Sequence, residues 1–183
     1  MSASPQKHIA AGLALLLGLL LVITVNIMEE DTAEDGILTY FTDFSLSLFG
    51  GGTFSAPELK KTAVTVVNVF STDCVPCIKE MPLLEALADA YANVRVLGLA
   101  SDWEDSDRYR EKLSGILSEA GVTYPVLIPD EAFFEKAYPL LHDCLPGTFF
   151  LDSKGRLLHF VSGALTAESW ELTVRTLLLG GKP

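Results

Sequence analysis

The stretch VVNVFSTDCVPCIKEMPLLEALADAY, residues 66–91, places a Cys-x-x-Cys pair where a strand pattern gives way to a helix pattern. Residues 62–70 are dense in Val and Phe, the composition of a strand covered on both faces. Residues 76–91 carry apolar side chains at steps of three and four, the period of a helix. We therefore expect Cys74 at the N-terminus of a helix that follows a buried strand.

This position gives the two thiols different chemistry. Backbone N–H groups and the helix dipole favour an anion at a helix N-terminus, so Cys74 should be the more acidic and reactive thiol. Two intervening residues let Cys77 reach Cys74 and resolve a mixed disulfide within the molecule. Pro76 stiffens the first turn, where its missing N–H costs nothing. The sequence thus predicts Cys74 as attacking nucleophile and Cys77 as resolving thiol.

Two other roles are open to a Cys-x-x-Cys pair. It could be half of a zinc site, completed from Cys144, His142 and His159. It could also be a purely structural disulfide, although a loop this small restricts the unfolded chain little. The strand-then-helix context favours redox chemistry over both, and no metal is assigned.

The rest of the chain from residue 44 alternates strand and helix signals, which predicts an α/β domain with a largely buried sheet. Gly50–Gly52 permits a tight reversal between two short strands, and Ser55 and Glu58 have the spacing of a capping box. Further strands are expected at 94–100, 124–128, 148–151 and 157–161, and helices at 105–120, 131–140 and 166–179, the last capped by Thr166.

Composition limits the class of protein. The 183 residues are 49% hydrophobic, with three cysteines and a net charge of −11. This excludes collagenous, disordered and disulfide-dense scaffolds and allows one ordinary domain plus an accessory segment. The acidic excess repels phosphate backbones, so nucleic acid is not expected as a partner.

Residues 9–28 read IAAGLALLLGLLLVITVNIM and carry no charge. Roughly 20 helical residues cross a bilayer, so we expect a retained transmembrane anchor, with a cleaved signal peptide or a buried core helix as alternatives. Lys7 before the run and acidic residues after it predict a cytoplasmic N-terminus. The expected organisation is a cytoplasmic tail (1–8), an anchor (9–28), an acidic linker (29–43) and a domain (44–183).

Residues 66–91 resemble the active-site region of the TlpA-like thioredoxin-fold disulfide reductases, a group that includes ResA and CcmG. DFSLSLFGGGTFSAPELKK (43–61) resembles that family's first hairpin and helix, and LPGTFFLDSKGRLLHFVSG (145–163) its cis-proline segment. The resemblance implies a thioredoxin-like fold with an N-terminal β-hairpin and a central α/β insertion at 102–128. It also assigns Pro146 to the cis-proline position and Leu145 to the residue whose backbone would pair with a bound substrate. The expected substrate-binding residues are Leu145, Pro146 and Pro76.

The resemblance implies a membrane-anchored thiol:disulfide oxidoreductase on the periplasmic side of the cytoplasmic membrane. It would reduce protein disulfides, in cytochrome c maturation or in other exported clients, with no cofactor beyond the redox-active disulfide Cys74–Cys77. A membrane thiol donor of the CcdA or DsbD kind would supply electrons. The alternatives are a thiol oxidase or isomerase on the same fold, or a non-catalytic metal-binding or redox-sensing module.

Three positions bear on how this site would work. Asp73 replaces the family's usual aromatic residue before the first cysteine, and its carboxylate should raise the pKa of Cys74 unless it points to solvent, which favours reductase chemistry. Asn68 replaces the buried acid of cytosolic thioredoxins, so the sequence alone leaves the proton acceptor for Cys77 unassigned. Cys144 is either a small buried hydrophobe or an accessory thiol beside the active site.

Overall fold

A computed structural model describes residues 41–141 and 145–183. The predicted tail 1–8, the predicted anchor 9–28 and most of the predicted linker 29–43 lie outside these ranges. Within them, no helix is long and apolar enough to cross a membrane. The transmembrane segment therefore stays a prediction.

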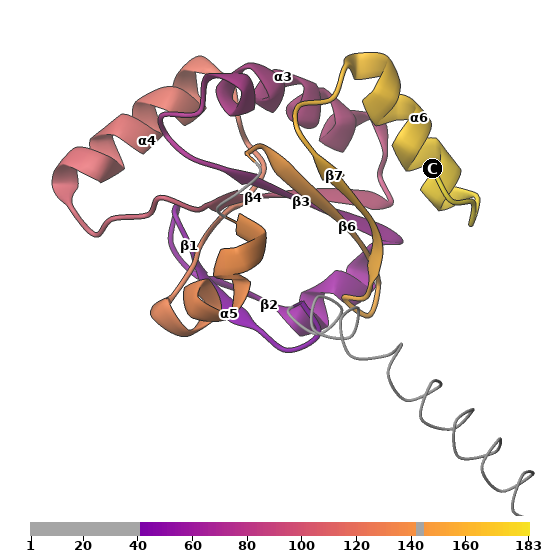
Figure 1. The fold of residues 1–183 in the computed structure, drawn as a ribbon, viewed down its shortest axis with the longest axis horizontal. Coiled ribbons are helices and arrows are strands. Elements are labelled where there is room, and N and C mark those ends of the chain that lie inside the picture. The colour runs from indigo at the N-terminus through magenta and orange to yellow at the C-terminus, as the bar shows by residue number, and fades with distance from the viewer. Residues whose placement is uncertain (1–40, 142–144) are drawn as a thin grey trace, which may run out of the picture. The chain divides into compact units, whose positions relative to one another are not determined.

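The described chain forms a seven-stranded mixed sheet with helices on both faces (Figure 1). The strand order is β2-β1-β5-β4-β3-β6-β7, in which β3, β4 and β5 are parallel and all other neighbours are antiparallel. The predicted α/β class is thus confirmed. In chain order the elements are β1 (Ser45–Leu48), β2 (Thr53–Ser55), the 3-10 helix η1 (Ala56–Lys61), β3 (Val64–Phe70), α3 (Val75–Ala90), β4 (Val94–Ala100), α4 (Asp107–Glu119), β5 (Val126–Ile128), α5 (Glu131–Leu141), β6 (Gly147–Asp152), β7 (Leu157–Ser162) and α6 (Ala167–Leu178).

Strand β3 is the centre of the sheet, and all seven of its residues are buried. It pairs with β4 along its whole length and with β6 from Val64 to Val69. Burial on both faces explains why Val and Phe crowd this part of the sequence. Asn68 is a fully buried amide within this apolar strand.

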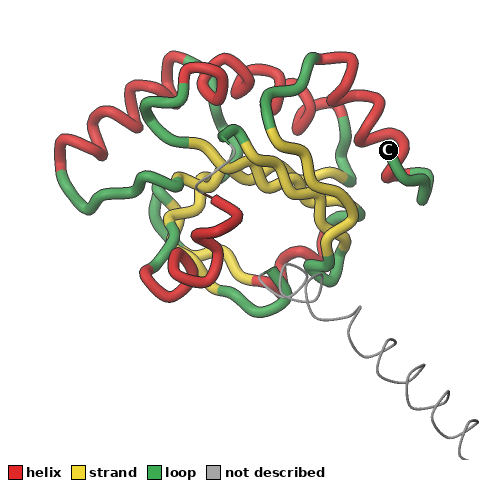
Figure 2. The backbone as a smooth tube through the Cα atoms, in the orientation of Figure 1, coloured by secondary structure: helices red, strands yellow, loops and turns green. Residues whose placement is uncertain are grey.

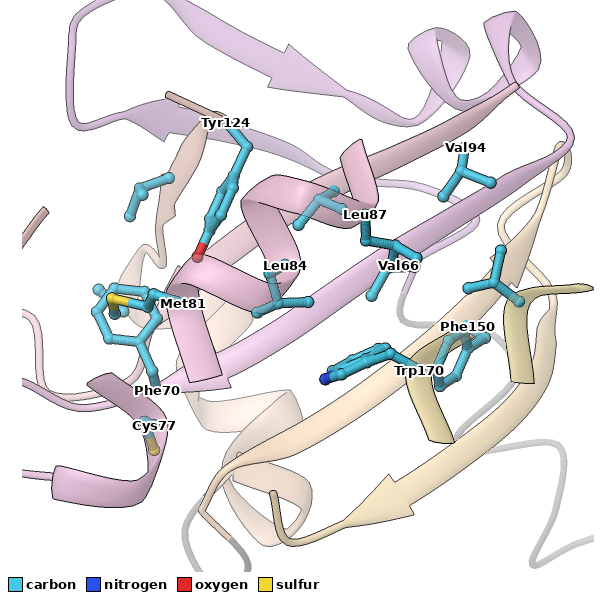
Figure 3. Close-up of a cluster of buried hydrophobic side chains, with 14 of the residues drawn as sticks. Val66, Phe70, Cys77, Met81, Leu84, Leu87, Val94, Tyr124, Phe150 and Trp170 are labelled. Carbon is cyan, nitrogen blue, oxygen red and sulfur yellow. The ribbon is translucent and has the colours of Figure 1, made fainter. Parts of the chain in front are cut away.

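Each face of the sheet has its own apolar core, so the sheet lies between two helical layers (Figure 2). On one face α3, α4 and α6 pack over the central strands. Figure 3 shows part of this core, which includes Phe70, Cys77, Met81, Leu84 and Trp170. On the other face the buried side chains come from the β1–β2 hairpin, η1 and α5, among them Phe44, Phe54, Leu59 and Phe133. Cys77 is thus a member of a hydrophobic core.

Packing begins three residues before the predicted start of the domain at residue 44. Phe41 is 3% exposed, and its ring centroid lies 5.9, 5.8 and 5.5 Å from those of Phe44, Phe133 and Phe149. The backbone carbonyl of Phe41 lies against Gly155, in the turn between β6 and β7. Gly155 has a φ of +79°, and a side chain there would collide with this carbonyl.

Local signals in the sequence form as expected. Gly51 and Gly52 take φ values of +95° and +85° in the turn between β1 and β2. The Glu58 carboxylate accepts a hydrogen bond from the Ser55 N–H at 3.3 Å, so the predicted capping box starts η1. The Thr166 hydroxyl caps α6 by accepting from the N–H of Ser169 at 3.2 Å.

Candidate active site

Cys74 is the residue that caps α3. The chain leaves β3 at Phe70, turns, and lets the N–H of Cys74 donate to the carbonyl of Ser71 at 3.2 Å. The N–H of Cys77 donates to the Sγ atom of Cys74 at 3.3 Å. This hydrogen bond places the Cys74 sulfur at the positive end of the helix, as the sequence predicts, where a thiolate is stabilised.

Cys74 and Cys77 form a disulfide, with Cα atoms 5.3 Å apart. The two sulfurs differ in accessibility. Cys77 is 0% exposed, whereas Cys74 is partly exposed and is followed by Val75, whose side chain is 58% exposed. Cys74 can therefore be reached from solvent, whereas Cys77 is reached only from within the molecule.

Pro146 lies at the same edge of the sheet. The peptide bond between Leu145 and Pro146 is cis, as expected from the resemblance. Pro146 immediately precedes β6, whose first residue Gly147 pairs with Val69 near the end of β3 that leads to Cys74. Leu145 is partly buried and packs against both cores. The other predicted site residue, Cys144, lies outside the described residues.

Glu80 is a buried carboxyl group that the sequence reading did not single out. It is 2% exposed and accepts hydrogen bonds from the N–H of Leu165 at 2.6 Å and the indole N–H of Trp170 at 3.0 Å. A third donor is the amide of Asn68 at 3.3 Å. Burial raises the pKa of Glu80 above its ordinary value, and these hydrogen bonds limit the rise.

The position of Glu80 suggests a role for it. It follows Cys77 by three residues on α3, so both side chains lie on one face of the helix. Asn68 also donates to Thr148 at 3.0 Å, while its Oδ1 atom is buried without a partner among the described residues. Glu80 is thus a carboxyl group with a raised pKa on the side of α3 that carries Cys77, where a proton acceptor is needed.

Asp73 points to solvent. Its side chain is 87% exposed and forms an ion pair with Lys112 of α4, with 2.7 Å between Nζ and Oδ1. Water and the ammonium group both reduce the field of the carboxylate. Asp73 therefore does not exert on the pKa of Cys74 the full effect expected of an unpaired neighbouring charge.

The zinc-site alternative gains no support from the described part of the chain. Residues 41–141 and 145–183 contain no group of three His, Cys, Asp or Glu side chains arranged to hold a metal. His159 lies on β7, with its ring centroid 5.8 Å from that of Phe150. The other candidate ligands, His142 and Cys144, lie outside the described residues.

Similarity to known proteins agrees with this geometry. The thiol-disulfide oxidoreductase ResA of Geobacillus kaustophilus is 28% identical over 170 residues, which cover 91% of this chain and 94% of that protein. The thioredoxin-like protein YneN of Bacillus subtilis is 28% identical over 129 residues, 70% of this chain and 73% of its own. A thioredoxin-family thiol:disulfide interchange protein from Chlorobium tepidum has a similar structure, with a TM-score of 0.63, 21% identity and coverage of 74% of this chain and 93% of its own.

The structural similarity confirms the predicted thioredoxin-like fold. The names of the relatives agree with the resemblance to thiol-disulfide oxidoreductases and with the prediction of an enzyme of that class. The sequence profile of the AhpC/TSA family matches residues 37–160, more than half of the chain. The chain therefore belongs to the AhpC/TSA family.

Proposed function

We propose that this protein is a thiol-disulfide oxidoreductase that reduces disulfide bonds of other proteins through Cys74 and Cys77. The observation that carries the proposal is the disulfide between a partly exposed sulfur at a helix N-terminus and a fully buried sulfur one turn later. The first sulfur can capture a client, and the second can release it.

In the first step the reduced enzyme attacks its client. The Cys74 thiolate, stabilised by the N-terminus of α3, attacks one sulfur of a client disulfide. A bond forms between Cys74 and that sulfur, and the other client sulfur leaves as a thiolate and takes a proton. We expect the client to contact Val75 and Pro76, which are exposed, and the backbone at Leu145 and Pro146.

In the second step Cys77 resolves the mixed disulfide. Its thiol gives its proton to the Glu80 carboxylate, which burial makes a stronger base than an exposed carboxylate because its pKa is raised. The Cys77 thiolate attacks Cys74, and the captured client sulfur leaves as a thiolate. Two electrons have then passed to the client, and the enzyme holds the Cys74–Cys77 disulfide. An external dithiol must reduce this disulfide before the next turnover.

We propose that this disulfide reduction takes place outside the cytoplasm. Residues 9–28 would anchor the chain in the cytoplasmic membrane, supported by their uncharged sequence and by Lys7 before them. The clients would be exported proteins, with apocytochrome c as one class, as the sequence resemblance to the TlpA-like reductases implies. The reducing dithiol would belong to a membrane protein of the CcdA or DsbD kind.

The test is disulfide reduction by the full chain in detergent, with insulin as client and dithiothreitol as donor. Cys74→Ser should lower the rate to that of dithiothreitol alone. Cys77→Ser should accumulate a mixed disulfide that Cys74→Ser cannot form. A reduction potential near that of thioredoxin, about −270 mV, supports a reductase, whereas one near −120 mV would indicate an oxidase. Undiminished activity of Cys74→Ser would reject the assignment.

A further inference from the structure

A second carboxylate holds the loop before Cys74, and it comes from a distant part of the chain. Asp102 follows β4 in the loop that leads to α4. Its Oδ2 atom accepts hydrogen bonds from the backbone N–H of Thr72 at 2.8 Å and from the Thr72 hydroxyl at 2.6 Å. Its Oδ1 atom accepts from the Tyr109 hydroxyl at 2.6 Å. One carboxylate thus joins the active-site loop to α4.

The partners of Asp102 are themselves fixed. Thr72, two residues before Cys74, is 4% exposed, and Tyr109 is 7% exposed. Burial and the adjacent Asp102 charge raise the pKa of Tyr109, so its hydroxyl keeps its proton and remains a donor. The Trp103 ring packs against Tyr109 at 5.2 Å and beneath the Arg110 guanidinium at 4.9 Å, which holds the loop that carries Asp102.

Asp102 and Asp73 differ in how their charge is compensated. Asp73 is exposed and paired with a lysine. In the described part of the chain no lysine or arginine forms an ion pair with Asp102, which is held by neutral donors alone. Neutral donors stabilise a carboxylate without cancelling its net charge. The Asp102 charge therefore acts on the active-site loop with less screening than that of Asp73.

We propose that Asp102 is a positioning residue for Cys74: its carboxylate fixes the loop at Thr72 against α4 and holds a negative charge on the loop two residues before the cysteine, where it opposes the effect of the helix N-terminus. This inference rests on the proposed function, because it concerns the reactivity of the attacking thiol. A charge that disfavours the Cys74 thiolate destabilises the reduced enzyme, which makes the dithiol a stronger electron donor. Asp102 thereby favours reduction of the client disulfide by the enzyme dithiol.

Four other charged side chains lie on this loop or on the helices beside it. Asp73 and Lys112 offset each other at the surface. Lys79 and Glu80 follow on α3, the former exposed and the latter buried beneath the helix. None of these four side chains is hydrogen-bonded to Thr72 in the described structure, so a variant of Asp102 changes the one charged side chain that is bonded to this residue.

The test is the pH profile of Cys74 alkylation by iodoacetamide in the reduced full chain. Asp102→Asn keeps an oxygen for the Thr72 N–H and removes the charge. We expect a lower pKa of Cys74 and a roughly tenfold change in the equilibrium with glutathione, which is about 30 mV toward the oxidising side. The matched control is Asp105→Asn, which removes an exposed charge that pairs with Arg110 and does not touch Thr72.

If Asp102→Asn does not fold, Tyr109→Phe tests the proposal through a shift of the opposite sign. It keeps the Asp102 charge and removes one hydrogen bond to it, so the pKa of Cys74 should rise. The role of Asp102 is overturned if the pH profile of alkylation is unchanged in the variant that folds. It is also overturned if Asp105→Asn shifts this profile as much as that variant does. Alkylation needs no client, so this result does not depend on the proposed function, which fails separately if the unmodified chain does not reduce insulin.

Discussion

The two cysteines are three residues apart, and their surroundings are opposites. On the Cys74 side Asp73 is exposed and pairs with Lys112, and Asp102 is partly exposed and accepts hydrogen bonds from Thr72 and Tyr109. On the Cys77 side Glu80 is 2% exposed and held by donors from β3, from the loop before α6 and from α6. The same functional group is thus used in two environments.

The difference separates two tasks. In the proposed mechanism the carboxylates on the Cys74 side act by charge, because a nearby negative charge alters the free energy of a thiolate. In the proposed mechanism the carboxyl group on the Cys77 side acts by protonation, because burial raises its pKa and makes it a stronger base. Substitutions on the two sides should therefore affect different measurements.

The largest effect is expected from Glu80→Ala. This change leaves the Asn68 amide, the Leu165 N–H and the Trp170 indole without their shared acceptor in a buried site. We expect the free energy of unfolding to fall by about 3 kcal/mol, as measured by urea denaturation of the disulfide form. Asp89→Ala, an exposed carboxylate on the same helix, should change stability by less than about 0.5 kcal/mol. Equal losses in the two variants would contradict the buried network.

A smaller effect should appear in the pH dependence of stability. The pKa of Glu80 is raised above 4.5 by folding, so between these two values the folded chain binds more protons than the unfolded chain. The contribution of Glu80 is then fully present below pH 4.5 and is lost as pH rises through its folded pKa. The free energy of unfolding of the parent should fall with rising pH relative to that of Glu80→Gln. Parallel pH curves for the two proteins would argue against a raised pKa.

The smallest effect is expected from Lys112→Met. Removing the ammonium frees the Asp73 charge, so the pKa of Cys74 should rise slightly. Because the pair is exposed, the alkylation rate at pH 7 should fall by no more than about threefold, and high salt should remove the difference. Adding Asp73→Asn should restore the parental rate. If the double variant stays as slow as Lys112→Met, the lysine acts through something other than Asp73.

The fold near the cysteines follows from local sequence. The Val-rich run before Cys74 forms β3 because it suits burial on both faces, and Thr166 begins α6 because its hydroxyl caps the first turn. The placement of the Cys74 sulfur at the helix N-terminus follows in the same way. These features depend on residues within a few positions of one another, which a reading of the sequence can relate.

The hydrogen-bond partners of Glu80 and Asp102 could not be predicted from neighbouring residues in this way. Thr72 and Asp102 are 30 residues apart, and Glu80 meets Trp170 across 90 residues. Glu80 also breaks the usual association of charge with exposure. One signal was present: Glu80 lies on the buried face of α3, between Cys77 and Leu84. A charged residue on an apolar helix face marks a buried polar site when its partners are supplied from elsewhere.

The contact between Phe41 and Gly155 fixes the position at which the described chain begins. Gly155 belongs to the turn after β6, at the edge of the sheet where Asp152 pairs with Val64, whereas the reactive loop follows the opposite end of β3. The described chain therefore begins near the end of β3 that is opposite to the disulfide. If residues 9–28 are a membrane tether, as proposed, the tether would join the domain at the end of the sheet opposite to the disulfide, so the point of attachment would leave the disulfide uncovered.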